Sequence, residues 1–465
     1  MAGLIGLRKG KSMRRGVTRR RFLGHVAGAV GAAAVGPYIL RAQDVSRRLN
    51  IAFVGTGGKG ESHLGLAKSE NCIAYCDVDK SRWAKAAAVA PNAQGYTDWR
   101  RMLDRHEKEL DAIVVATPDH SHAGPTLRAI RAGKHVYTEK PLTWSIQEAR
   151  LLAEATAKHK VATQMGNQGH ANEGNRLVVE WVRAGAIGQV LEVHTWTNRP
   201  VWPQGIAQRP PSEPVPQNLD WESWIGPAPF REYHAGLHPF KWRGWFDFGC
   251  GAVGDMGCHT WDGPYWAMDP DYPTAVELLE IRNKTDETFP SQSHFKWEFP
   301  AKGRRPAFVA HWYSGGLKPP TPEEMLNDPK RQGKDGKKPT LPASGSLYIG
   351  TKGKLLVEGD YGNSPRLIPE SFMQEYQRPE KTIPRSPGHK QEWLMACRGE
   401  KPWDYPGSNF ATYAGPITEV MLLGAICERI GQVGFRIECD PVKRVVKTRE
   451  ALAYVSRENR KGWEL

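Results

Sequence analysis

The residues best suited to chemistry begin with three glycines, Gly55-x-Gly57-x-x-Gly60, and an acid, Asp77, seventeen positions later. The glycines follow an apolar run, 49–54, and precede a segment that we expect to be helical to residue 69. Glycines at this spacing permit a tight turn and let a pyrophosphate approach the N-terminus of the next helix. An acid at the end of the second strand can accept hydrogen bonds from an adenosine ribose and repels a 2′-phosphate. The predicted ligand is therefore NAD, held by Gly55, Gly57, Gly58, Gly60 and Asp77, while Lys80 and Arg82 leave NADP as the less favoured alternative.

A second candidate group consists of Asp255 and His259, which stand four residues apart. If this segment is helical, both side chains project from one face and can converge on one hydroxyl. Oxidation of a secondary alcohol requires a base for the hydroxyl proton and a hydride acceptor on the other side of the carbon. We therefore expect His259 to be the general base, with Asp255 orienting it or accepting a substrate hydroxyl. Without that spacing, His259 would be interpreted as a structural histidine.

Three motifs resemble the hallmark segments of the Gfo/Idh/MocA oxidoreductase family. They are Thr117-Pro118-Asp119-His120-Ser121-His122, Glu139-Lys140-Pro141, and the segment 251–262 that contains Asp255 and His259. The resemblance extends over nearly all of the chain after residue 48 and implies an N-terminal Rossmann domain followed by an α/β domain whose open sheet faces the nicotinamide. It also implies that Lys140 polarises the reacting oxygen and contacts the nicotinamide, and its charge would lower the pKa of the hydroxyl. By the same resemblance Thr117, His122 and Glu139 lie at the cofactor, whereas His120 is read as a loop residue.

The elements that must position these residues alternate between short apolar strands and helices. Strands are predicted at 49–54, 71–76, 94–96, 112–116, 135–138 and 161–165, with helices between them. This alternation indicates βαβ units and a doubly wound parallel sheet. After residue 166 the pattern changes, and strands at 189–197, 276–282, 294–299 and 307–313 indicate a large, mostly antiparallel sheet. We predict a Rossmann domain over 43–168 and a C-terminal α/β domain over 169–465 for substrate binding and oligomerisation, with a surface loop at 318–344.

A stretch rich in Trp, Pro and Gly, residues 195–266, holds eight of the 17 tryptophans. Large aromatic side chains usually build core, but breakers around Arg199 and Trp202 should keep some of them exposed. Flat aromatic faces beside polar donors suit a sugar ring. We therefore expect a carbohydrate or polyol substrate, bound by Asn167, His170, Arg199, Trp202 and Asp262.

The N-terminal residues explain most of the charge. The net charge is +14, but nine Lys and Arg and no acid lie within residues 1–42, so the excess is not clustered on a folded domain, and we expect no nucleic acid partner. Residues 18–23, Thr-Arg-Arg-Arg-Phe-Leu, precede a weakly apolar run that is interrupted by glycines. This pattern is typical of a twin-arginine signal, which predicts export to the periplasm by the twin-arginine translocation machinery. An uncleaved signal used as a tether is the alternative, and no stable membrane span is expected.

The seven cysteines contain no CxxC pair, so we predict no metal site, and pairing of Cys250 with Cys258 stays open. We also expect a homo-oligomer.

Two enzymatic functions compete. One is an NAD(P)-dependent oxidoreductase of a sugar, polyol or sugar derivative with a tightly held cofactor, because an exported enzyme has no replenished nicotinamide pool. The other is a redox-neutral glycosidase or lyase that oxidises C3, eliminates and reduces again, as some members of the resembled family do. Its C2 proton would be removed by His259, Tyr233 or Tyr265. A non-enzymatic sugar-binding role is the third alternative.

Overall fold

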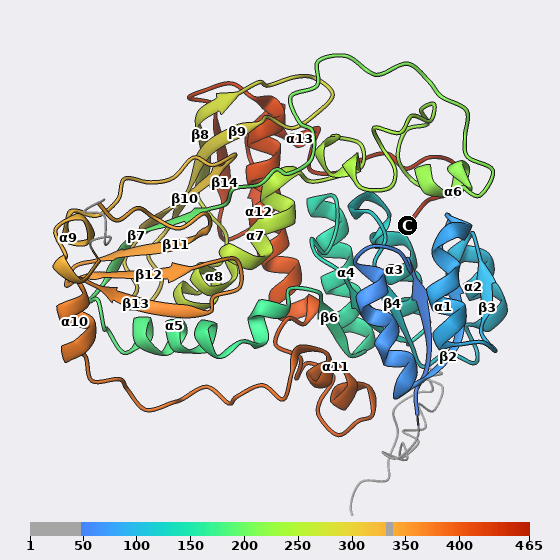
Figure 1. Cartoon of the computed structure of the whole chain (residues 1–465), viewed down its shortest axis with the longest axis horizontal. Coiled ribbons are helices and arrows are strands. Elements are labelled where there is room, and N and C mark those ends of the chain that lie inside the picture. The colour runs from blue at the N-terminus through green and yellow to red at the C-terminus, as the bar shows by residue number, and fades with distance from the viewer. Residues whose placement is uncertain (1–47, 332–337) are drawn as a thin grey trace, which may run out of the picture. The chain divides into compact units, whose positions relative to one another are not determined.

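An all-parallel sheet of six strands occupies the N-terminal part of the molecule (Figure 1). The computed structural model describes residues 48–331 and 338–465. The strand order is β3-β2-β1-β4-β5-β6, which is the doubly wound order with its switch point between β1 and β4. The strands are β1 (Asn50–Val54), β2 (Asn71–Cys76), β3 (Gln94–Tyr96), β4 (Ala112–Val115), β5 (His135–Thr138) and β6 (Thr163–Met165). All four residues of β4 are buried, as expected for a strand with both faces covered.

The connections of this sheet are helical. They are η1 (Gly60–Lys68), η2 (Lys80–Arg82), α1 (Trp83–Val89), α2 (Trp99–His106), η3 (Asp119–Ser121), α3 (Ala123–Arg131) and α4 (Ile146–His159). The predicted capping box is present at the start of α4, where Ser145 and Glu148 bond reciprocally. The segment after the glycine turn, η1, is a 3₁₀ helix and not an α-helix.

A second sheet of nine strands follows, as predicted mostly antiparallel. Its order is β13-β12-β11-β7-β10-β9-β8-β14-β15, and its parallel pair is β7 with β10. The strands are β7 (Val190–Trp196), β8 (Ala275–Arg282), β9 (Gln292–Phe299), β10 (Phe308–Ser314), β11 (Gly345–Gly350), β12 (Lys354–Glu358), β13 (Ser364–Ile368), β14 (Arg436–Asp440) and β15 (Val445–Val446).

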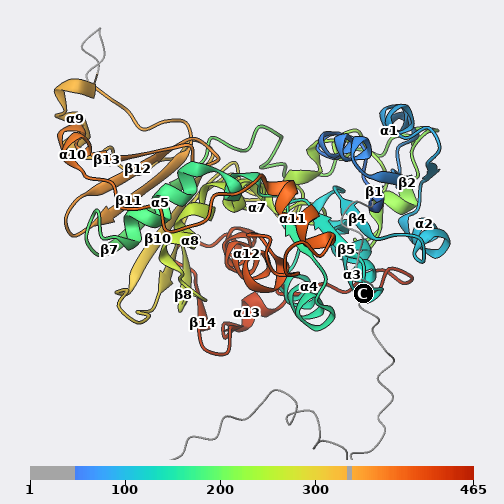
Figure 2. The same cartoon turned by 90° about the horizontal axis from the view of Figure 1, so that it is seen from below.

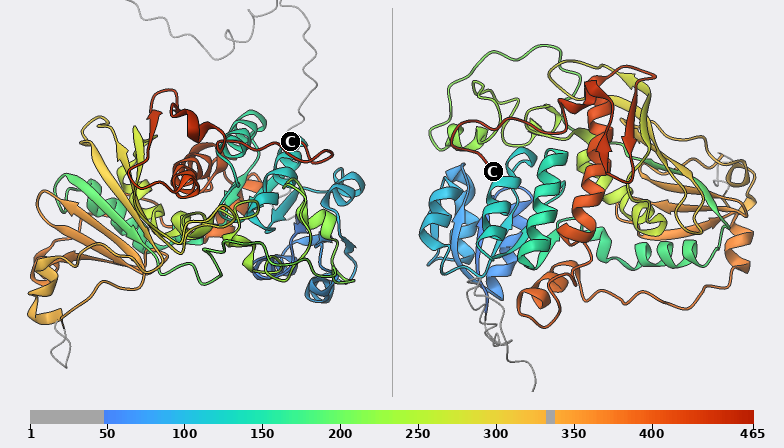
Figure 3. Two further views of the ribbon diagram at one scale, coloured as in Figure 1. Left: turned by 90° about the horizontal axis from the view of Figure 1, so that it is seen from above. Right: turned by 180° about the vertical axis from the view of Figure 1, so that it is seen from behind.

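Helices pack on one face of this sheet (Figures 2 and 3). They are α5 (Glu173–Arg183), α7 (Gly251–Thr260), α8 (Asp262–Met268) and α12 (Gly415–Ile430), the last preceded by a π-helical turn, η7 (Phe410–Ala414). Burial in β9 alternates strictly, so Phe295 and Trp297 enter the core, and the Trp297 indole donates to the Val420 carbonyl of α12 at 2.9 Å. The intervening residues, including His294 and Lys296, point to the opposite face.

The remaining helices are short. They are η4 (Gln168–Ala171), α6 (Trp221–Ile225), η5 (Lys241–Gly244), α9 (Glu323–Leu326), η6 (Pro329–Arg331), α10 (Glu370–Glu375), α11 (His389–Cys397) and α13 (Arg449–Leu452). The predicted surface loop at 318–344 therefore contains α9 and η6. One segment within the described ranges, Phe410–Ile430, is long and apolar enough to cross a membrane, and 78% of its most apolar window is buried inside the molecule. The predicted twin-arginine signal lies outside the described residues.

Helix α11 belongs spatially to the parallel sheet, although it comes from the C-terminal part of the chain. Trp393 and Cys397 are fully buried in one cluster with Ile51, Phe53 and Val114. The Gln164 side chain of β6 also donates to the His389 carbonyl of α11 at 3.0 Å. The parallel sheet is therefore completed by residues that lie far beyond residue 168.

Candidate active site

The glycine turn has the tight geometry that its sequence predicts. Gly55 and Gly58 have positive φ angles of 89° and 53°. A Cβ atom on Gly60 would lie 2.1 Å from the Gly55 carbonyl oxygen, and one on Gly55 would lie 2.5 Å from the Ala116 oxygen. The turn therefore excludes side chains at Gly55 and Gly60, while Gly58 has open space around it. This is the backbone cradle that a pyrophosphate requires.

Asp77 follows β2 and faces this turn. Its Oδ2 accepts the backbone N–H groups of Thr56 at 2.8 Å and Gly57 at 3.1 Å. Burial raises the pKa of Asp77, and the N–H groups of Asp79, Thr56 and Gly57 counteract part of that effect. Asp77 thus shapes the glycine turn besides bordering the pocket in which a ribose would lie.

Lys140, which follows β5, forms an ion pair with Asp255 on α7. Lys140 Nζ lies 2.7 Å from Asp255 Oδ1 and 2.9 Å from the Asp255 carbonyl oxygen, and each side chain is 15% exposed. Arg243 Nε lies 3.5 Å from the same Oδ1. Burial opposes the charge on Lys140, but Asp255 outweighs this effect and raises the pKa of Lys140. Burial likewise opposes the charge on Asp255, whose pKa is nevertheless lowered by Lys140 and Arg243, so both partners are ionised at neutral pH.

His259 lies on the same helix, but Asp255 does not orient it. Their spacing on α7 is as predicted, yet no hydrogen bond joins them, because Lys140 and Arg243 engage the Asp255 carboxylate. His259 Nδ1 is buried and has no hydrogen-bond partner in the structure as described. The ring of Tyr361 lies 4.9 Å from the His259 ring. Burial and the charge of Lys140 lower the pKa of His259 to about 3, which keeps the imidazole neutral.

Asp119 is a further titratable group beside the ion pair. It is 6% exposed, and its Oδ2 accepts the Cys250 N–H at 3.1 Å. Burial raises the pKa of Asp119 to about 7, even though Lys140 and Arg243 act to lower it. The site therefore contains an acid that exchanges its proton near neutrality.

Glu139 lies on the other side of Lys140 and is anchored from two directions. Its Oε1 lies 2.7 Å from His63 Nε2 and accepts from Gln168 Nε2 at 3.1 Å. Burial would raise the pKa of Glu139, but His63 and the charges of Lys59 and Lys140 lower it to about 2. Glu139 Oε2 and Thr117 Oγ1 are buried without partners in the described residues. Both atoms can bond to a ligand in this region.

A pocket of about 400 Å³ connects all of these groups. Its lining includes the glycine turn and Asp77, and it also includes Lys140, Asp255 and His259. The glycine cradle, the acid after β2 and the unpartnered oxygens of Thr117 and Glu139 fit a dinucleotide. The residues that would hold NAD are Gly55, Gly57, Gly58, Asp77, Thr117, Glu139 and Lys140.

Part of the Trp-rich stretch lies on the nucleotide side of this pocket. We call residues Leu219–Phe248 the aromatic cover (Figure 1). It packs around Trp221, Trp224 and Trp245 and joins the Rossmann domain through Asp79, whose Oδ2 lies 3.1 Å from His238 Nε2. The backbone N–H of Asp220 also donates to the Val78 carbonyl at 2.8 Å. Because Asp79 follows Asp77 so closely, the cover borders the part of the pocket predicted for adenosine.

His122, which was predicted to lie at the cofactor, does not border the pocket. His122 is buried, and both ring nitrogens lie 2.8 Å from backbone carbonyl oxygens, Nδ1 from Pro141 and Nε2 from Thr117. It therefore connects two loops that do border the pocket. His120 is also buried, with Nε2 2.9 Å from the Trp224 carbonyl oxygen of the aromatic cover.

Three predicted substrate residues, Asn167, His170 and Asp262, lie together but not on the pocket wall. Asp262 Oδ1 lies 3.2 Å from Asn167 Nδ2, 3.0 Å from His170 Nδ1 and 2.7 Å from the Tyr413 hydroxyl. All three side chains are almost completely buried. They form a polar network that joins η4 to α8, because Asp262 needs hydrogen-bond partners at that depth.

Arg199 borders the pocket, whereas Trp202 does not. Trp202 is 5% exposed, and its indole donates to Gln204 at 2.9 Å. Tyr233 and Tyr265 also lie outside the pocket wall, so neither is placed to remove a substrate proton there. The thiols of Cys250 and Cys258 are both free.

Several pocket residues escape prediction from the sequence. Tyr361 and Asp360 lie between β12 and β13, and Arg243, Trp224 and His238 belong to the aromatic cover. Of these unpredicted pocket residues, Asp119 could have been found from the sequence, because it lies in the motif 117–122 between a buried strand and a helix.

The fold and this pocket together define an NAD-binding oxidoreductase architecture. Residues 49–167 match the model of the oxidoreductase family with an NAD-binding Rossmann fold, and residues 179–292 match the model of its C-terminal alpha/beta domain. The two matches cover half of the sequence. The chain therefore belongs to the Gfo/Idh/MocA oxidoreductase family, and NAD is the cofactor of its Rossmann domain.

Individual relatives resemble the chain more distantly. An inositol 2-dehydrogenase of Serratia proteamaculans is 30% identical over 152 residues, which are 31% of this chain and 44% of that protein. The match thus spans less than half of the relative. The WlbA dehydrogenase of Bordetella pertussis, solved with NADH and UDP-GlcNAcA, has a TM-score of 0.57 and 17% identity over 85% of this chain and 99% of that chain. A levoglucosan dehydrogenase solved with NADH and levoglucosan has a TM-score of 0.54 and 15% identity over 85% of this chain and all of that chain. At these identities the solved structures show the fold.

Proposed function

We propose that the protein is an NAD-dependent dehydrogenase that oxidises a secondary alcohol of a sugar, polyol or sugar derivative. The observation that carries this proposal is one pocket that joins the glycine turn to the Lys140–Asp255 pair and to the unpartnered imidazole of His259. The relatives support a polyhydroxylated substrate, because their names and ligands are inositol, levoglucosan and a nucleotide sugar.

The chain's own residues divide the work. NAD, when bound, supplies the acceptor for the substrate's hydride. Lys140 has a fixed positive charge that favours the alkoxide form of the reacting hydroxyl. Asp255 holds the Lys140 ammonium in place, Arg243 engages the same carboxylate, and the neutral ring of His259 accepts the hydroxyl proton.

The test is steady-state reduction of NAD with inositols, levoglucosan and free sugars as substrates. We expect Lys140→Met to lower kcat by at least about 1,000-fold while NAD binding stays within a few-fold, since the loss is of transition-state charge stabilisation. Lys158→Met, at an exposed position of α4, is the control and should behave like the native enzyme. Activity of Lys140→Met within a few-fold of native would remove this residue from the reaction.

We also propose that the cofactor is held tightly. The aromatic cover supports this, because Trp224, His238 and Trp242 border the pocket on the nucleotide side and the cover is joined to Asp79. Mass spectrometry of the protein, purified without added cofactor and then denatured, should release close to one NAD per chain. An empty protein would contradict tight retention but not dehydrogenase activity.

The redox-neutral glycosidase or lyase is the second candidate, and Asp119 favours it. Cleavage of a glycosidic bond needs a proton for the leaving group, and an acid with a pKa of about 7 can supply one. Tyr233 and Tyr265 lie outside the pocket wall, and burial raises the pKa of Tyr361 and keeps its phenol protonated, so His259 is the residue that would take the C2 proton. Turnover of an aryl glycoside in deuterated water should then place deuterium at C2 and release the aglycone without net NADH. NADH formation with free sugars, and no C2 label, would decide for the dehydrogenase.

Export to the periplasm by the twin-arginine machinery remains part of this proposal, and it rests on residues 18–23 alone. Replacing Arg19 and Arg20 by Lys should leave precursor in the cytoplasm; normal export of that variant would exclude this route.

A further inference from the structure

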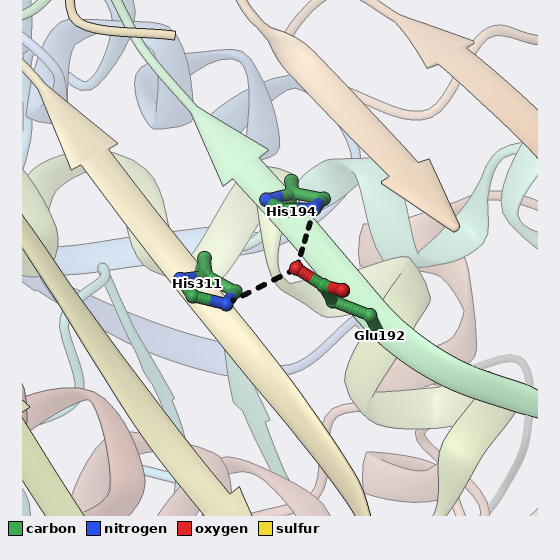
Figure 4. A group of neighbouring side chains, drawn as sticks. All are labelled: Glu192, His194 and His311. Carbon is green, nitrogen blue, oxygen red and sulfur yellow. Dashed lines mark ion pairs between the residues drawn. The ribbon is translucent and has the colours of Figure 1, made fainter. Parts of the chain in front are cut away.

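Three side chains that could bind a metal ion lie together on the C-terminal sheet, away from the candidate active site. They are Glu192 and His194 of β7 and His311 of β10 (Figure 4). Their ligand atoms all lie within 4.8 Å of one another, and among residues 48–331 and 338–465 this is the one group of three or more such side chains. None of the three borders the NAD pocket.

Strand geometry brings these side chains together. Glu192 and His194 are two residues apart on β7, so they project from the same face of the sheet. Strands β7 and β10 pair in parallel, with His311 opposite His194. The imidazole rings of the two histidines stack with their centres 4.8 Å apart. The positions of all three side chains are therefore set by the backbone of the sheet.

The distances between the donor atoms suit a tetrahedral metal ion. Glu192 Oε1 lies 3.0 Å from His194 Nε2 and 3.3 Å from His311 Nε2. Zinc binds nitrogen and oxygen at about 2.0–2.1 Å, so neighbouring ligand atoms around a tetrahedral ion are about 3.3–3.4 Å apart. The ligand atoms of the two histidines lie within 4.8 Å of each other.

Neighbouring groups hold both imidazoles by the nitrogen that faces away from Glu192. His194 Nδ1 lies 3.0 Å from the Tyr313 hydroxyl, and His311 Nδ1 lies 3.0 Å from His294 Nε2. The His294 ring in turn stacks on Tyr313 with ring centres 4.0 Å apart. Metal-binding histidines are typically anchored in this way, through the ring nitrogen that does not bind the metal.

The local charge also favours a cation. Glu192 is the carboxylate of the group, and Lys296, the nearest cation on β9 in register with His311, is engaged by Glu277 and Glu298 at 3.1 Å each. The Glu192 side chain is 41% exposed, whereas those of His194 and His311 are 11% and 14% exposed. An ion can therefore enter from solvent past Glu192.

We propose that Glu192, His194 and His311 form a binding site for a divalent cation of the zinc class, coordinated by two Nε2 atoms and one carboxylate oxygen. Three protein ligands leave the fourth position of a tetrahedral ion for water. The site is independent of the proposed dehydrogenase function, because its residues and those of the pocket are separate.

The experiment is titration of the full chain with ZnCl₂ after treatment with a chelator, in competition with a chromophoric chelator. Native protein should bind one Zn²⁺ per chain. Glu192→Gln and His311→Gln should each weaken binding by at least about 100-fold because each removes a ligand, and His294→Gln, which removes an anchor, by about 10- to 100-fold. The control is His159→Gln on α4, which should bind like the native protein. Co²⁺ in place of Zn²⁺ should give the visible absorption of a tetrahedral site.

Two outcomes would overturn the proposal. One is native protein that binds no stoichiometric Zn²⁺, which would leave the group as a hydrogen-bonded cluster only. The other is unchanged Zn²⁺ binding in Glu192→Gln. This variant is nearly the same shape as the native side chain and partly exposed, so its thermal unfolding without metal should match that of the native protein.

Discussion

Asp77 has two expected roles, binding the adenosine ribose and fixing the glycine turn, and replacing it tests both. Asp77→Ala removes the predicted acceptor for the adenosine ribose and the acceptor for the Thr56 and Gly57 N–H groups. Hydrogen bonds to charged groups contribute about 1.5–3 kcal/mol, so we expect NAD affinity to fall by about 10- to 100-fold. Fluorescence titration with NAD measures the change, and Asp104→Asn, at an exposed position, should leave the affinity unchanged.

The same variant tests cofactor choice. Removal of the carboxylate also removes its repulsion of a 2′-phosphate, so NADP affinity should fall less than NAD affinity or rise. Equal losses for both cofactors would show that Asp77 acts only through the glycine turn.

For individual residues, the sequence correctly predicted the features that depend on the spacing of residues close together in the chain. The glycine turn and the placement of Asp255 and His259 on one helix follow from short-range rules, and the structure shows both. The sequence did not predict that Asp255 pairs with Lys140, because Lys140 lies 115 residues earlier and no local pattern joins the two. His122 and Asp262 were expected at the pocket but are buried away from its wall. A polar side chain in a motif can form hydrogen bonds inside the protein as well as bind a ligand.

Among the elements, the aromatic cover gives a prediction about cofactor release. His238→Ala removes the contact with Asp79 that joins the cover to the Rossmann domain. We expect bound NAD to dissociate about 10-fold faster, because one charge-assisted hydrogen bond is lost where the cover meets the nucleotide pocket. Stopped-flow displacement of NAD measures this rate, with Lys241→Ala, exposed in the same cover, as the control. An unchanged rate would mean that the cover does not limit release.

Most elements of both sheets were predictable, because strand and helix periodicities differ and both are local. The location of the aromatic cover was not. The cover lies within the stretch 195–266, whose eight tryptophans suggested sugar binding. However, Trp221, Trp224 and Trp245 pack in one cluster, beside Val78. The proposed zinc site could not be predicted from the sequence either, because His194 and His311 belong to strands that are far apart in the chain and pair only after folding.

For the whole molecule, buried histidines predict how stability depends on pH. Burial lowers the pKa of His120 and His259 to about 3 and that of His135 and His389 to about 4. The unfolded chain therefore binds protons at these groups between pH 6.5 and about 4, where the folded chain does not. Each contributes up to about 1.4 kcal/mol of lost stability per pH unit in that window.

Two buried acids act in the opposite direction. Burial raises the pKa of Asp119 to about 7 and that of Glu428 to about 8, so the folded state loses stability as pH rises from the ordinary carboxyl values, about 4, up to these values. Four histidines outweigh two acids below pH 6.5. The midpoint of thermal unfolding should therefore rise from pH 4.5 to about 6.5 and decline slightly towards pH 8; a midpoint that rises steadily to pH 8 would contradict this account.

Helix α11 has a consequence for the order of events during synthesis. A ribosome delivers β1 to β6 first, and N-terminal domains usually fold as they emerge. Here Trp393 and Cys397 pack against the face of the sheet formed by Ile51, Phe53 and Val114, which Leu64, Leu66 and Ala86 also cover, so part of that face stays uncovered until more than two hundred further residues have been made. The nucleotide-binding domain can therefore complete its folding only after the C-terminal part of the chain has been made. A fragment ending at residue 168 should bind hydrophobic dyes and unfold without cooperativity.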